Sequence, residues 1–150
     1  MISNNEQQTL NFGKDLAKKL KGGEVILLIG DLGAGKTTLV KGVAKELGIE
    51  KHVTSPTFVL MKVYEIQNSK SKVQELVHID TYRGLGIDDL ENIGALEYFG
   101  QNDTICLVEW GSGLEKYLID NQINHKIITI KNINQNTREI IISNKQESNK

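Results

Sequence analysis

The chain is poor in proline, cysteine and arginine. Its 150 residues include one proline, Pro56, one cysteine, Cys106, and two arginines, Arg83 and Arg138. A single cysteine excludes an internal disulfide and is typical of a protein from a reducing cytosol. Two arginines leave few groups for bidentate phosphate contacts, and a formal net charge of -1 gives no general attraction to DNA.

Long apolar runs are also absent. The longest, such as VILLI at 25–29, are far too short to span a bilayer. The start MISNNEQQT has neither the basic segment nor the apolar segment of a signal peptide, so we expect a cytoplasmic protein without membrane association. At 39% hydrophobic and 25% charged residues, the chain is long enough for a sizeable core. We predict one domain over residues 1–143 and a polar, frayed tail over 144–150.

Strand and helix patterns alternate along the chain. Ser3 and Glu6 have capping-box spacing before a helical stripe that Gly22 and Gly23 end. Alternation of this kind predicts an α/β fold with a mainly parallel sheet flanked by helices, to which antiparallel hairpins are added. The predicted strands are 24–30, 57–66, 73–80, 105–110, 125–131 and 138–143. The predicted later helices are 36–47, 114–119 and, as one or two short helices broken at Gly94, 88–99.

The segment GDLGAGKT, Gly30 to Thr37, fits the pattern G-x-x-x-x-G-K-[ST] at every fixed position. Its glycines let successive N–H groups turn toward phosphate oxygens, and the following helix adds the positive end of its dipole. Lys36 would supply charge to the β and γ phosphates, and Thr37 a hydroxyl to Mg²⁺. The alternative is a glycine-rich helix start with a chance lysine. Because motif and context agree, we predict a P-loop NTPase-type domain.

Carboxylates close two of the apolar runs. Glu109 ends ICLVE, and Asp80 ends ELVHID. A charge at the end of a buried strand is costly unless it is paired or faces a metal, and ligands of open α/β sheets bind at the carboxyl ends of strands. We predict that Thr37 and Glu109 hold Mg²⁺ and that Lys36, Asp80 and Glu109 carry the catalysis. The alternative is that these carboxylates emerge into solvent.

The lone proline lies in TSPTF, residues 54–58, among the hydroxyls of Thr54, Ser55 and Thr57. Pro56 fixes one φ angle and biases Ser55 toward extended backbone. Segments after the first helix of P-loop proteins often cover the γ-phosphate and Mg²⁺, so we predict a nucleotide-sensitive cover here. The alternative is that Pro56 begins an edge strand.

The remaining candidates are weaker. His52, His78 and His125 show no metal spacing and are expected to be surface or core residues. Trp110 adjoins the predicted site but also suits a core. The segment NKQE resembles a guanine-reading N-K-x-D signature, but Glu147 replaces the required Asp, which favours ATP over GTP.

Four blocks, GDLGAGKTT, TSPTF, HIDTYR and LVEWG, resemble in order and spacing the bacterial TsaE (YjeE) proteins. The resemblance covers most of the chain, from about Thr9 to Arg138. It implies an ATPase that binds ATP and Mg²⁺ and hydrolyses ATP slowly. It also implies TsaB and TsaD as partners, and tRNA as an indirect one, in the threonylcarbamoylation of adenosine 37 that produces t6A in tRNAs reading ANN codons.

The resemblance also implies roles for single residues. Thr37 and Glu109 match the Mg²⁺ residues, and Asp80 and Trp110 match positions important for activity.

Two further contacts are implied on the base side of the nucleotide. Thr9 resembles a contact near the N-terminus, and the C-terminal hairpin supplies another that would fall on Arg138, although NQNTR replaces the more usual glycine-containing turn. The predicted nucleotide-binding residues are therefore Thr9, Asp31, Leu32, Gly33, Ala34, Gly35, Lys36, Thr37, Thr38, Thr57, Trp110 and Arg138.

Two other functions stay open. A small P-loop kinase that phosphorylates a metabolite would need an acceptor site and a cationic lid, for which two arginines are few. A nucleotide-gated binding module with negligible turnover would instead hold ATP for many hours beside its partners.

Overall fold

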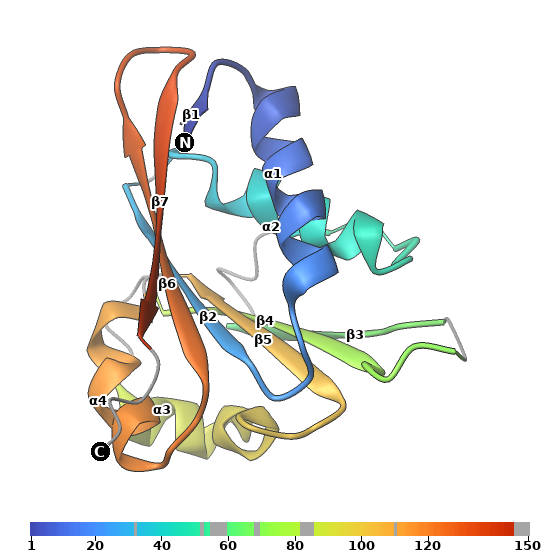
Figure 1. The fold of residues 1–150 in the computed structure, drawn as a ribbon. Helices are drawn as coiled ribbons and strands as arrows, with labels where there is room; N and C mark the ends of the chain where they lie inside the picture. The colour runs from blue at the N-terminus through green and yellow to red at the C-terminus, as the bar shows by residue number, and fades with distance from the viewer. Residues whose placement is uncertain are drawn as a thin grey trace.

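The fold is a seven-stranded sheet covered by helices on both faces (Figure 1). The computed structural model describes residues 1–31, 33–51, 53–54, 60–67, 70–81, 86–109 and 111–145. The strand order is β1-β7-β6-β2-β5-β4-β3. Among the described residues, no helix is both long enough and apolar enough to cross a bilayer.

The centre of the sheet is parallel. It consists of β6 (His125–Asn132), β2 (Val25–Gly30), β5 (Thr104–Glu109) and β4 (Glu75–Asp80), with β2 paired to β6 and β5, and β5 to β4. Nearly all side chains of β2, β4 and β5 are buried, as expected for parallel strands with helices on both faces. The predicted α/β fold with a mainly parallel sheet is confirmed.

Antiparallel strands complete both edges. β3 (Met61–Glu65) pairs with β4, and β7 (Arg138–Lys145) pairs with β6 as the predicted closing hairpin. Strand β7 extends two residues into the predicted tail, because Asn144 and Lys145 still pair with β6. A further strand, β1 (Ile2–Ser3), pairs with β7 and was not predicted.

The first helix, α1 (Glu6–Lys19), corrects the predicted capping box. Its N-cap is Asn5, whose side chain accepts a hydrogen bond from the Gln8 amide at 2.8 Å. Ser3 lies in β1 instead, and its hydroxyl is 2.7 Å from the Thr9 hydroxyl. Pairing of Ser3 with β7 therefore overrides its local spacing to Glu6.

Helices α1 and α2 (Lys36–Glu46) cover one face of the sheet and touch through two glycines. A Cβ on Gly13 would lie 2.2 Å from the Leu39 carbonyl oxygen, and one on Gly42 would lie 2.1 Å from the Leu10 carbonyl oxygen. Only glycine permits so close an approach, and it brings the first turns of α1 beside the start of α2.

The other face carries α3 (Ile87–Asn92), η1 (Ala95–Tyr98), η2 (Gly111–Leu114) and α4 (Glu115–Asp120). The predicted break at Gly94 is confirmed, since this residue has φ 79° between α3 and η1. The chain thus has a core on each face of one sheet, and the carboxyl ends of β2, β4 and β5 lie next to one another.

Candidate nucleotide and magnesium site

The loop between β2 and α2 has the features of a phosphate-binding loop. Gly33 and Gly35 have φ of 80° and 107°, a left-handed backbone that favours glycine. Gly35 is the N-cap of α2, and no side chain of the described residues caps that helix. Helix α1 differs, because the side chain of its N-cap Asn5 accepts a hydrogen bond from the Gln8 amide. The start of α2 therefore keeps the amide groups and the positive dipole end that bind anions.

Lys36 begins α2 and is folded back over the loop. Its ammonium donates to the carbonyl oxygens of Gly30, at 2.5 Å, and Asp31, at 3.1 Å. The side chain is only 5% exposed. Burial lowers the pKa of Lys36, and the negative charges of Glu109, Asp80 and Asp31 oppose that shift. A partly desolvated cation thus faces several carboxylates at the carboxyl edge of the sheet.

The two strand-end carboxylates are neighbours. Asp80 and Glu109 are register partners in the parallel pair β4–β5, and they are 4% and 3% exposed. Thr81 fixes the backbone of Glu109, because its hydroxyl and its amide both donate to the Glu109 carbonyl oxygen, at 3.0 and 3.1 Å. The structure therefore brings Lys36, Asp80 and Glu109 together, and neither carboxylate emerges freely into solvent.

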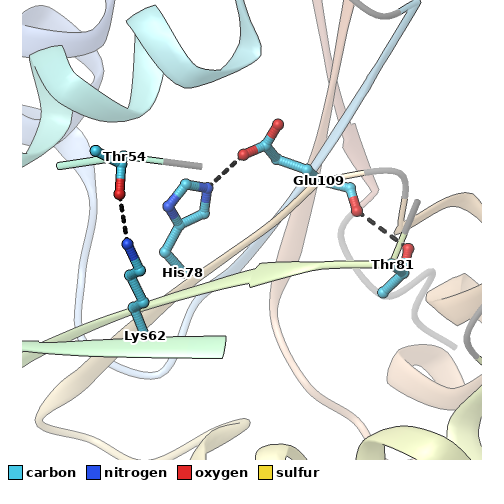
Figure 2. A network of polar contacts seen from close by, with 5 residues as sticks. All are labelled: Thr54, Lys62, His78, Thr81 and Glu109. Carbon is cyan, nitrogen blue, oxygen red and sulfur yellow. Dashed lines mark hydrogen bonds and ion pairs between the residues drawn. The ribbon is translucent and has the colours of Figure 1, made fainter. Parts of the chain in front are cut away.

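A buried histidine adjoins this group (Figure 2). His78 is fully buried, and its Nε2 lies 2.5 Å from Glu109 Oε2. A surface or core position was predicted for His78, without a role in the site, and the structure places it in the core. The available signal was its position two residues before Asp80, which places both side chains on one face of β4.

The predicted cover begins at Thr54, whose hydroxyl accepts a hydrogen bond from Lys62 on β3 (Figure 2). This contact ties the start of the cover to the strand that pairs with β4. Ser55, Pro56 and Thr57 lie outside the described residues, so the cover stays a prediction.

Leu32 and Trp110 also lie outside the described residues, so their predicted contacts with the nucleotide stay predictions. Arg83, one of the two arginines, lies outside the described residues too.

Thr9 and Arg138 lie on the other side of the loop. Both line a cleft of about 290 Å³, together with Gly35, Thr38 and Gln135.

Thr9 is buried in α1, and a Cβ on Gly35 would lie 3.6 Å from its methyl group. Arg138 Nε donates to the Ala34 carbonyl oxygen at 3.0 Å, and its Nη2 to that of Gly33 at 3.4 Å. Arg138 thus braces the loop against the hairpin, and the cleft opens beside this contact.

The donor set would suit a Mg²⁺ ion that is held partly by a bound nucleotide. No group of three or more His, Cys, Asp or Glu side chains in the described part of the chain would hold a metal by itself. Mg²⁺ is usually bound by one or two carboxylates together with substrate phosphates and water. Thr37, half-buried in the first turn of α2, and Glu109 provide this limited set.

A family model described as threonylcarbamoyl adenosine biosynthesis protein TsaE matches residues 3–140. The chain belongs to the TsaE family. Its relatives include the TsaE of Bacillus subtilis, 42% identical over 137 residues, which span 91% of this chain and 79% of that protein. The TsaE of Treponema pallidum is 34% identical over 143 residues, 95% of this chain and 98% of that protein.

The fold of this TsaE-family chain is similar to a solved structure. The crystal structure of Bacillus subtilis YdiB aligns with a TM-score of 0.68 and 38% sequence identity. The alignment covers 96% of this chain and 83% of that one. The predicted resemblance to the TsaE family is thus confirmed along most of the chain.

Proposed function

We propose that this protein is a cytoplasmic P-loop ATPase that binds Mg·ATP and hydrolyses it slowly. Its turnover supports a partner complex, TsaB–TsaD, in the threonylcarbamoylation of adenosine 37 of tRNA. The observation that carries the proposal is the convergence of Lys36 with Asp80 and Glu109 beside a glycine loop at a helix start. Membership of the TsaE family, whose relatives are described as tRNA threonylcarbamoyladenosine biosynthesis proteins, supplies the process.

Each group has a role in this proposal. Lys36 would exchange its carbonyl partners on the loop for phosphate oxygens, and Thr37 and Glu109 would hold Mg²⁺ or its water shell. Asp80, beside Glu109, orients the attacking water. When bound, Mg²⁺ would neutralise charge on the β and γ phosphates.

Slow turnover is expected from the placement of Arg138, the arginine among the described residues. Phosphoryl transfer is accelerated by about 10³–10⁵ when an arginine stabilises the charge of the transition state. Arg138 instead donates to backbone carbonyls of the loop and of the hairpin turn. A partner that completes the site would therefore raise the rate.

The test is ATP turnover measured for the chain alone, with TsaB–TsaD, and with TsaB–TsaD and tRNA, beside Lys36→Ala as a control. We expect slow turnover alone, a higher rate with the partners, and loss of both in the variant. Phosphate transfer to a small metabolite rather than to water would support a kinase instead. ATP that stays bound and unhydrolysed for many hours beside the partners would support a binding module.

A further inference from the structure

His78 lies directly behind the proposed metal carboxylate. In the β4–β5 register, His78 pairs with Leu107 and Asp80 pairs with Glu109, so His78 is the diagonal neighbour of Glu109 on the same face. Its imidazole points toward the Glu109 carboxylate (Figure 2). Both side chains are almost completely removed from solvent, at 0% and 4% exposure.

The metal role proposed for Glu109 sets the direction of the hydrogen bond. A carboxylate that binds a metal is ionised and only accepts, so His78 Nε2 carries the proton and donates it to Glu109 Oε2. The other nitrogen, Nδ1, is buried without a hydrogen-bond partner among the described residues. A buried nitrogen that lacks a partner lowers stability. Core packing alone would be served better by an apolar residue, which indicates that the bond to Glu109 is what the position requires.

As a result, hydrogen bonds hold both the backbone and the side chain of Glu109. Thr81 binds its backbone carbonyl, and His78 binds Oε2 of its side chain. Lys62, opposite His78 in the β3–β4 register, donates to Thr54 instead. Within the described residues the imidazole is therefore the group that holds Oε2, and this leaves Oε1 as the oxygen available to a metal or its water.

We infer that His78 is a positioning residue that holds the Glu109 carboxylate through Oε2 and so keeps Oε1 available to the Mg²⁺ that would accompany a bound nucleotide. The inference rests on the proposed function, because it assigns Glu109 to the metal. Groups that orient metal ligands typically change metal affinity by about 10–100-fold when they are removed. The role is thus measurable apart from hydrolysis.

A pair of amide variants separates positioning from packing. The Gln amide nitrogen reaches the place of imidazole Nε2, whereas the shorter Asn reaches only the place of Nδ1. His78→Gln therefore keeps a donor toward Glu109, and His78→Asn loses it. The matched control is His125→Asn, because His125 on β6 is also buried. Among the described residues its Nε2 also lacks a partner, and its Nδ1 lies 3.0 Å from the Ile123 carbonyl oxygen.

The measurement is calorimetric binding of a non-hydrolysable ATP analogue with and without Mg²⁺. The readout is the dissociation constant without Mg²⁺ divided by the dissociation constant with Mg²⁺. We expect His78→Asn to reduce this ratio about tenfold, while metal-free binding stays within about twofold of wild type. His78→Gln and His125→Asn should keep the ratio within about threefold.

Equal ratios in His78→Gln and His78→Asn would overturn the inference, and so would an unchanged ratio in His78→Asn. Wild-type protein that binds no nucleotide would refute the proposed function itself, a distinguishable result.

A second readout needs neither nucleotide nor a variant. Nitrogen-15 NMR of the wild-type chain should show His78 as the Nε2–H tautomer with a hydrogen-bonded proton. An Nδ1–H tautomer would overturn the inference even if both variants failed to fold.

Discussion

The two ends of the parallel strands both carry hollows and buried charge, but they are built differently. At the amino ends, a hollow of about 420 Å³ is lined by uncharged residues, including Asn102, Tyr117 and Asn121. The nearby charges, Glu24 and Lys126, form an ion pair with each other. At the carboxyl ends, Lys36 faces several carboxylates beside an uncapped helix start. The hollow at the amino ends is larger than the cleft of about 290 Å³ beside the loop. It is nevertheless not the better site for an anion, because the charges next to it already pair with each other.

The largest expected effect concerns the metal carboxylate. Glu109→Gln should lower ATP turnover on the order of a hundredfold or more, because metal assistance contributes several kcal/mol to phosphoryl transfer. Metal-free ATP binding should stay close to wild type. Steady-state turnover at saturating Mg²⁺ measures the effect, with Glu24→Gln at the amino end as the control. A turnover within about twofold of wild type would remove Glu109 from the site.

A comparison of two lysines gives the next effect. Lys36→Ala should weaken ATP binding by roughly tenfold to a hundredfold, because hydrogen bonds to charged groups contribute about 1.5–3 kcal/mol. Lys126→Ala should leave ATP binding unchanged and lower the free energy of unfolding by about 1–3 kcal/mol, because it leaves Glu24 buried without its cation. Calorimetry and urea unfolding separate the two. Similar ATP affinities in both variants would abolish the distinction between the ends.

The placement of α1 gives a smaller effect. Gly13→Ala puts a methyl group against the Leu39 carbonyl oxygen and should lower the free energy of unfolding by about 1–3 kcal/mol. Because α1 carries Thr9 to the loop, ATP binding should weaken by a few fold as well. Gly113→Ala is the control, since a Cβ there meets no atom within 4 Å. Unchanged unfolding of Gly13→Ala would show that the helices can separate without cost.

The smallest expected effect concerns Cys106, which lies in β5 between the amino and carboxyl ends of the strands. Cys106 is buried in β5, and burial raises the pKa of its thiol. Because the thiolate is the reactive form, an alkylating reagent should leave the native chain unmodified over a period in which the urea-unfolded chain reacts completely. Mass spectrometry measures both. Rapid modification of the native chain would mean that the central strands open far more readily than their burial indicates.

The sequence predicted the parts of the site that depend on local pattern. A glycine-rich motif between an apolar strand and a helix located Lys36, and apolar runs that end in an acid located Asp80 and Glu109. What it missed depends on pairing between distant segments. The role of His78 needs the β4–β5 register, and the bracing of the loop by Arg138 needs the hairpin beside it.

The same reason explains the errors at the N-terminus. Ser3 and Glu6 satisfy a local capping pattern, but two residues of β1 gain more by pairing with β7, which leaves Asn5 as the cap. The contact of Gly13 with Gly42 is likewise visible only once two helices are packed together.

In the proposed function, Mg·ATP binds at the carboxyl ends of the strands and not at the amino ends. Amide NMR of the chain titrated with Mg²⁺ and a non-hydrolysable ATP analogue distinguishes the two ends. We expect large shifts for the amides of Gly33, Gly35 and Lys36, with little change at Asn102 and Asn121. Shifts centred on the amino-end hollow, or none at all, would contradict it.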